Sequence, residues 1–152
     1  MAISNVFEEK SVQGLLTRLD KLTPDSKAKW GKMNAGQMLR HLNVPYDMAY
    51  TDQYPVAKGL KRWLITLLAK NVVVSDKPYK QNSRTAKEFL VTDEQDFEKQ
   101  KKTLVDYITR VQKDGRTHFE GKESTSFGNL TANEWNNLFG KHLDHHFDQF
   151  GI

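Results

Sequence analysis

The sequence predicts an all-α protein, and two observations carry that prediction. Apolar residues recur at helical spacing almost everywhere, whereas the alternation typical of strands is nearly absent. In addition, paired capping residues stand before several of these apolar segments. We therefore expect an antiparallel four-helix bundle with an extra short helix and long connecting loops.

The first half of the chain predicts three helices. The first is capped by Asn5 and Glu8, and its apolar face is formed by Val12, Leu15, Leu16, Leu19 and Leu22. The second starts at Asn34, with Gln37 at the reciprocal capping position. The third follows Pro55. We expect its apolar residues to face the core and its basic residues to face solvent, namely Leu60, Trp63, Leu64, Leu67 and Leu68 against Lys58, Lys61 and Arg62.

After the third helix, the sequence predicts two further helices and the loops that precede them. Residues 72–74 read as a short extended piece, and residues 75–86, which are polar and contain a proline, read as a long loop. A fourth helix begins near residue 92 and ends at Asp114-Gly115. A loop rich in Gly, Ser and Thr leads to Thr131, which forms a capping box with Glu134 and starts a last helix that runs to Gly151.

Length and composition define one domain and exclude several classes of site. The 152 residues are expected to form a single helical domain, 1–152. The absence of cysteine excludes disulfides, zinc-thiolate sites and a cysteine nucleophile from this chain. A net charge of +4 spread along the sequence argues against nucleic acid as a partner. Without a long apolar run or a leader-like start, we expect a cytoplasmic protein that does not bind membranes.

The last helix carries the most informative residues, His142 and His146. They stand one turn apart and about 40° apart around the helix axis, on the same side as Phe139 and Leu143. His145 falls at the edge of that apolar face. Because each inward imidazole carries a donor and an acceptor that need partners, a divalent metal bound by both rings is a natural solution. The alternative is that these are core histidines bonded to neighbouring groups.

A third ligand has to come from another helix, and His41 on the second helix is the candidate. Pro45 lacks the N–H that would bond to the His41 carbonyl, so we expect the helix to kink or loosen there. His118 is interpreted as a surface residue.

Imidazole ligands without thiolates suit zinc, nickel, copper or iron, and of these we expect zinc or nickel. No general acid or base stands out. Tyr46 and Asp47 qualify only if the proline turns them inward.

Two segments resemble a known superfamily. They are WGKMNAGQMLRHL at 30–42 and FGNLTANEW at 127–135, the second leading into KHLDHHFDQFG at 141–151. Both resemble the DinB/YfiT-like superfamily of four-helix-bundle metalloproteins, and within it a branch of uncharacterised bacterial proteins. The resemblance implies that His41, His142 and His146 bind a divalent metal and leave a coordination position open. One departure is that residues 124–126 lack the His-Pro that this branch often carries before Phe-Gly.

The same resemblance implies a function. Relatives include transferases and isomerases that use small thiols such as bacillithiol or mycothiol, and others that look like metal-dependent hydrolases. We therefore expect a metal-dependent transferase or hydrolase in which the three-histidine site activates a low-molecular-weight thiol or water toward a small-molecule substrate. The alternative is a non-catalytic helical bundle whose metal is structural or which binds a small ligand. Superfamily members are often homodimers, so a homodimer is expected here.

Overall fold

The computed structural model of the chain describes residues 2–152, and most of them are helical. The helices are α1 (Glu9–Asp20), α2 (Ala35–Tyr50), α3 (Gly59–Ile65), α4 (Asn71–Val74), α5 (Phe97–Phe119) and α6 (Ala132–Phe150). A π-helical turn, Thr66–Lys70, joins α3 to α4, and a 3-10 turn spans Lys87–Phe89. Two short strands, β1 (Glu123–Ser124) and β2 (Gly128–Asn129), form an antiparallel hairpin. The prediction of a mostly helical chain is confirmed.

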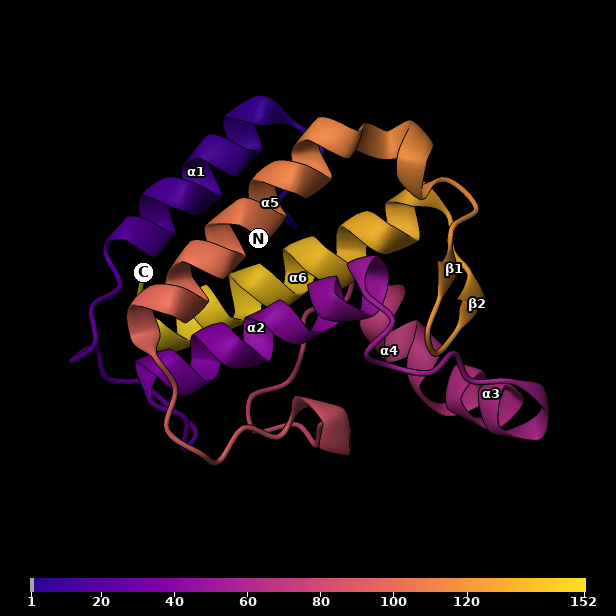
Figure 1. Cartoon of the computed structure of the whole chain (residues 1–152), viewed down its shortest axis with the longest axis horizontal. Helices are drawn as coiled ribbons and strands as arrows, with labels where there is room; N and C mark the ends of the chain where they lie inside the picture. Colours follow the sequence, from indigo (N-terminus) through magenta and orange to yellow (C-terminus); the bar gives the residue numbers. More distant parts are fainter. Residues whose placement is uncertain (1) are drawn as a thin grey trace.

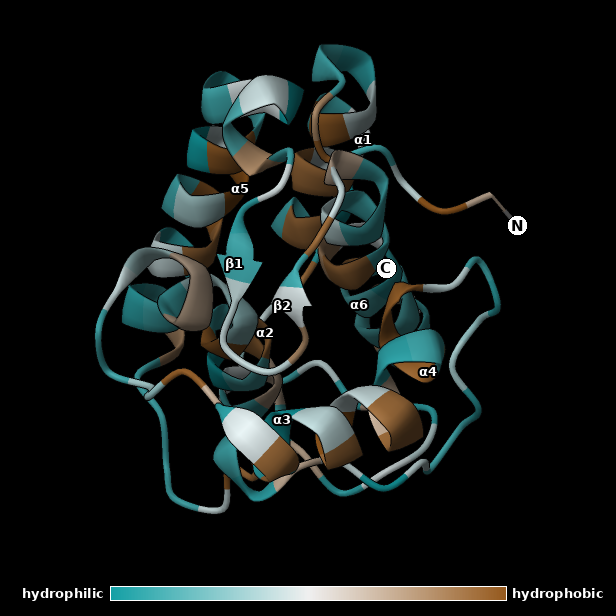
Figure 2. Ribbon diagram, turned by 90° about the vertical axis from the view of Figure 1, so that its right-hand side faces the viewer, coloured by the Kyte–Doolittle hydropathy of each residue, from teal (hydrophilic) through white to brown (hydrophobic). Residues whose placement is uncertain are grey.

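The four long helices enclose the hydrophobic core. Both α1 and α2 pack against α5 and α6, and α5 and α6 also contact each other (Figure 1). The apolar stretches of these helices turn toward the space between them (Figure 2). The buried side chains at the centre include Leu15 and Leu19 from α1, Met38 and Leu42 from α2, Leu104 and Ile108 from α5, and Phe139 and Leu143 from α6.

Capping boxes fix where α2 and α6 begin, as the sequence predicts. The Asn34 side chain accepts a bond from the Gln37 N–H at 2.8 Å, and the Gln37 side chain accepts one from the Asn34 N–H at 3.0 Å. Thr131 and Glu134 exchange the same pair of bonds at 3.2 and 2.9 Å. Each box satisfies two helix-end donors. These two helices carry the candidate metal ligands, so the capping boxes fix the position of each ligand relative to the start of its helix.

Two predicted helix starts are wrong. The Asn5–Glu8 capping box does not form, because the Asn5 side chain accepts a bond from the Phe7 N–H and α1 begins only at Glu9. The fourth predicted helix begins at Phe97 instead of near residue 92, with the Asp96 side chain accepting from the Lys99 N–H. Residues 92 and 93 instead stay outside the helix, and their carbonyls accept bonds from the Gln37 side chain on α2.

The end of α5 is only partly as predicted. Gly115 adopts a φ of 73° and interrupts the helical backbone, as expected of a stop signal. Beyond this kink the chain resumes helical geometry as far as Phe119, whose side chain is fully buried. Burial of this aromatic ring explains why the helix continues past the glycine, because apolar burial outweighs the local preference to stop.

The orientation predicted for the third helix is wrong. Its apolar face points to solvent, with Leu60 71%, Trp63 59% and Leu67 65% exposed. The helix projects from the four long helices (Figure 1), and it is its continuation, α4, that packs against α6. Residues 71–74 are helical and not extended. Neither α3 nor any other helix within residues 2–152 is long and apolar enough to cross a membrane.

Gly140 on α6 allows the N-terminal segment to cross that helix at close range. A Cβ built at this position overlaps the carbonyl oxygen of Ser4. We expect Gly140→Ala to lower the free energy of unfolding by roughly 1–3 kcal/mol, because rigid backbone has to move. Urea denaturation measures this change.

Gly14 on α1 provides the matched control, because it is a helical glycine with no atom within 4 Å of a built Cβ. Gly14→Ala should raise stability by roughly 0.5–1 kcal/mol through helix propensity alone. If Gly140→Ala proved as stable as Gly14→Ala, the close crossing at Ser4 would be refuted.

Candidate metal centre

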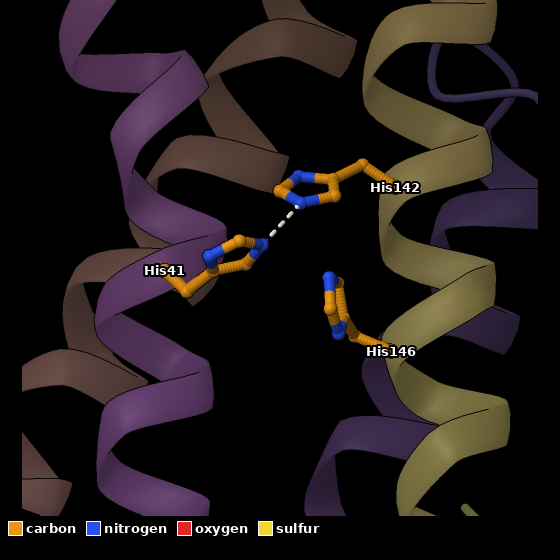
Figure 3. Close-up of side chains that lie close together, drawn as sticks. All are labelled: His41, His142 and His146. Atoms are coloured by element: carbon orange, nitrogen blue, oxygen red, sulfur yellow. Dashed lines mark hydrogen bonds between the residues drawn. The ribbon is translucent and has the colours of Figure 1, made fainter. Parts of the chain in front are cut away.

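Three histidines from two helices meet at one point. His41 projects from α2 toward His142 and His146, which project from successive turns of α6 (Figure 3). One ligand nitrogen from each ring can be chosen so that all three lie within 4.8 Å of one another, and the Nε2 atoms of His41 and His142 are 2.8 Å apart. His41 and His146 are buried, and His142 is partly exposed. The structure thus brings together all three residues that the sequence selected.

This donor set fits a divalent transition metal. Zinc binds imidazole nitrogen at about 2.0–2.1 Å, so two ligands in a tetrahedral site lie about 3.3 Å apart. The observed spacings bracket that value, and a shift of about half an ångström between His41 and His142 would bring the closest pair to it. Three neutral nitrogen donors without thiolate or carboxylate suit zinc or nickel, and the set does not choose between them.

The second ring nitrogen of His41 is held by a backbone carbonyl. His41 Nδ1 lies 2.8 Å from the carbonyl oxygen of Phe89, which can only accept, so Nδ1 carries the proton and donates it. The lone pair is therefore on Nε2, the atom that faces the other two histidines. The Phe89 ring also packs against His41 and His142. A ligand imidazole is commonly oriented by a second hydrogen bond of this kind.

His146 is oriented by Gln149, a residue that sequence analysis missed. His146 Nδ1 lies 2.7 Å from the Gln149 side-chain oxygen, and the Gln149 amide donates to the carbonyl of Trp30 at 2.7 Å. The second bond identifies the nitrogen of the amide, so its oxygen accepts from His146 and leaves Nε2 with the lone pair. The available signal was spacing, because Gln149 stands three residues after His146 on the same buried face.

Gln149→Met is expected to weaken metal binding. The variant keeps the length and burial of the side chain but removes the acceptor that orients His146, so affinity for zinc should fall about 10–100-fold. Competition with a chromogenic chelator measures the affinity. Gln149→Glu retains an acceptor and should bind within about ten-fold of the natural protein. Equal affinity of the Met variant and the natural protein would show that Gln149 does not orient the ligand.

The imidazole rings of the three histidines are neutral near pH 7, and burial favours this neutral form. Burial lowers the pKa of His41, and it lowers the pKa of His142 and His146 still further, with the positive charges of neighbouring imidazoles adding to the effect. Neutral rings are what a metal requires, since a protonated nitrogen cannot act as a ligand. Burial therefore reduces the competition between protons and a metal ion for these nitrogens.

The stability of the metal-free protein should depend on pH as a result. Below about pH 6.5 the unfolded chain binds protons on these histidines while the folded chain does not, so the free energy of unfolding falls as the pH falls. Urea denaturation at about pH 7.5 and pH 5 in the presence of chelator measures it. His142→Gln should show a smaller decrease between the two pH values. An identical decrease in both proteins would contradict the assignment.

His145 lies beside the centre without joining it. Its ring packs edge-on against Trp30, Tyr79 and His146, with centroid distances of 5.9, 5.6 and 5.0 Å. The group of ligand atoms within reach of one ion contains His41, His142 and His146 and does not contain His145. The expectation that His145 sits at the edge is thus confirmed. His118, the remaining histidine, is exposed on α5.

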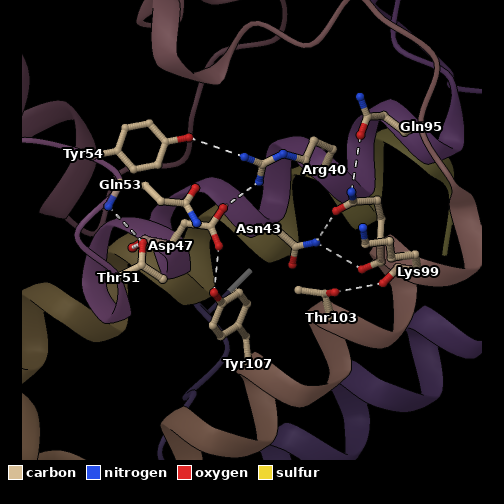
Figure 4. Close-up of polar contacts among 11 residues, drawn as sticks. Arg40, Asn43, Asp47, Thr51, Gln53, Tyr54, Gln95, Lys99, Thr103 and Tyr107 are labelled. Carbon is tan, nitrogen blue, oxygen red and sulfur yellow. Dashed lines mark hydrogen bonds and ion pairs between the residues drawn. The ribbon is translucent and has the colours of Figure 1, made fainter.

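Tyr46 and Asp47 do not reach the site, because α2 continues through Pro45 to Tyr50 and carries them on another face. Asp47 accepts hydrogen bonds from Arg40 and from the Tyr107 hydroxyl, both at 2.7 Å (Figure 4). Burial and the bond to Asp47 raise the pKa of Tyr107 to about 12. This polar cluster joins α2 to α5 and has no part in the histidine site.

Comparison with known proteins assigns a family. Fold and site together define a helical protein with a buried three-histidine cluster between two helices. Residues 7–151 match the family described as a protein of unknown function, DUF1569, and the chain belongs to that family. Searches of curated proteins and of solved structures gave no match.

Proposed function

We propose that this protein is a metal-dependent enzyme of the DinB/YfiT-like type, a transferase or hydrolase acting on a small molecule. In this proposal the long helices α1, α2, α5 and α6 form the antiparallel four-helix bundle of that superfamily. The observation that supports it most is the convergence of His41, His142 and His146, with two of the three rings oriented through their far nitrogens. Zinc or nickel is the expected ion.

The arrangement of donors favours chemistry over a purely structural ion. Structural zinc sites have four protein ligands, whereas catalytic sites have three and leave one position to solvent or substrate. Among residues 2–152, the group of metal-binding side chains at this point contains three members. A divalent ion held there supplies Lewis acidity, which lowers the pKa of a small thiol or a water molecule at the open position to near neutral.

The residues of the chain have defined tasks in this proposal. His41, His142 and His146 hold the ion. The Phe89 carbonyl and Gln149 keep two of those rings in the correct tautomer and orientation. The three histidines line a cavity to which His145 and the loop at 124–127 also contribute, and a substrate would reach the ion from there. This loop is the segment that lacks the His-Pro of the branch that the sequence resembles. Its Ser124 hydroxyl bonds within the hairpin, to the Gly128 carbonyl and the Phe127 N–H, so in this proposal the loop shapes the cavity and supplies no imidazole.

X-ray absorption spectroscopy of the zinc-loaded protein tests the proposal. We expect three nitrogen ligands and one exchangeable oxygen ligand, and addition of 2-mercaptoethanol should replace the oxygen scatterer with sulfur. Four protein ligands that do not change on addition of thiol would identify a structural ion and contradict the enzyme proposal. The same experiment with His145→Ala serves as a control, and its spectrum should match that of the natural protein.

A further inference from the structure

A large cavity opens directly over the three histidines. Its volume is about 810 Å³, and the rings of His41, His142 and His146 form part of its wall. Cavities of roughly 300–1,000 Å³ hold most of the surface of a drug-sized molecule. The space is therefore much larger than a water molecule or a small thiol requires, and the excess must fit another part of the substrate.

The wall of this cavity is mainly apolar and comes from segments far apart in the sequence. The helical segment 65–73, the loop before α5, the hairpin loop and α6 all contribute, through side chains that include Ile65, Leu68, Val72, Phe89, Phe127 and Leu138. Such a wall takes up the hydrophobic body of a ligand, with the free energy coming from apolar area removed from water.

Several apolar residues on the rim are left uncovered. Leu68, Val72 and Leu90 line the cavity, yet they remain 76%, 58% and 63% exposed. Exposed apolar side chains that line a cavity of this size favour a surface that a ligand covers. A hydrophobic ligand that extended from the histidines to the rim would cover these three side chains.

The charges around the cavity have one sign. Two charged side chains, Lys32 and Arg84, line it, and within residues 2–152 no Asp or Glu does. The three imidazoles are neutral, so an ion held by them would keep its full charge of two. The cavity consequently favours an anionic head group and disfavours a cationic one.

We propose that the substrate of this site is a lipophilic monoanion of drug-like size. Its apolar body lies along the wall formed by residues 65–73 and the loop before α5, and its anionic head lies at the three histidines. This inference rests on the proposed function, because the ion supplies most of the positive charge. Decanoate, which joins an apolar chain to a single carboxylate, is a suitable probe.

Isothermal titration of the zinc-loaded protein with decanoate tests the proposal, with decyltrimethylammonium as a cation of the same chain length. Decanoate should bind saturably, with an affinity at least about ten-fold higher than that of the cation. Ala69→Trp fills the cavity from the π-helical turn and should weaken decanoate binding about ten-fold or more. Leu68→Ser, which removes apolar contact without adding bulk, should weaken it by a factor of about three to ten.

Leu67→Trp is the matched control, because it places the same ring on the same turn but outside the cavity wall. Its affinity for decanoate should stay within about two-fold of the natural protein. Equal affinities of the Ala69→Trp and Leu67→Trp variants, or equal binding of decanoate and the cation, would overturn the inference. Zinc binding measured in the same samples separates the two claims. Stoichiometric zinc without decanoate binding contradicts this inference alone, whereas absence of zinc binding contradicts the proposed function.

Discussion

Replacing any one of His41, His142 and His146 with alanine is expected to reduce bound zinc from about one ion per chain to about a tenth or less after dialysis. Each ring supplies one of three donors, and two imidazoles alone hold the ion too weakly to survive dialysis. Metal analysis of protein purified without a histidine tag measures the ratio.

The same substitutions should remove the stabilisation that the ion provides. An ion that binds only the folded chain adds about 4 kcal/mol to the free energy of unfolding at a free concentration of a thousand times its dissociation constant. Addition of zinc should therefore raise the unfolding midpoint of the natural protein but not that of the alanine variants.

Two other histidines provide controls for these variants. His118 is exposed on α5, and His145 lies beside the centre but outside the ligand group. His118→Ala and His145→Ala should both retain about one ion per chain. Retention of zinc by His142→Ala, or loss of zinc in His118→Ala, would show that the ion is held elsewhere.

Asp47→Ala is expected to lower the free energy of unfolding by about 2–4 kcal/mol, because it removes the acceptor of the Tyr107 hydroxyl and the charged partner of Arg40. Asp47 is 8% exposed and accepts from the Arg40 guanidinium and the Tyr107 hydroxyl (Figure 4). The partial exposure of Arg40 limits the loss, since water can solvate its freed guanidinium. Urea denaturation measures the change. Zinc affinity should be unaffected, because this cluster lies on another face of α2.

Asp106→Ala is the matched control for this variant. Asp106 pairs with Lys102 one turn away on α5, and both side chains are more than half exposed. The loss on its removal should be about 0.5 kcal/mol or less. If the Asp47 and Asp106 variants had the same stability, the buried cluster would contribute nothing beyond an ordinary surface pair.

The sequence was most informative where a local rule agreed with burial. The capping boxes at Asn34 and Thr131 define helices whose inward faces follow from periodicity, so the positions of His41, His142 and His146 could be predicted. Local capping chemistry is specified by a few neighbouring residues. This chemistry places the first residues of α2 and α6 correctly. The same pattern fails at Asn5 and Glu8, where the neighbouring Ser4 and Val6 are bonded to Asp144 and Asn136 on α6.

Other features depended on tertiary contacts that periodicity does not encode. A helical pattern shows which residues of α3 share a face, but it cannot show that this face, with Leu60 and Leu67, lies outside the core. The bond from the Gln149 amide to the Trp30 carbonyl, which fixes the amide that orients His146, joins distant segments in the same way. So does the buried cluster around Asp47. Each of these features follows only once α2, α5 and α6 are placed against one another.

The central claim is that one divalent ion is held between α2 and α6. Anomalous diffraction at the absorption edge of the bound metal, from crystals of untagged protein that never contacted nickel resin, tests it most directly. We predict a single strong anomalous peak within bonding distance, about 2.0–2.2 Å, of one nitrogen each of His41, His142 and His146. Absence of a peak there in protein that contains stoichiometric metal would contradict the account.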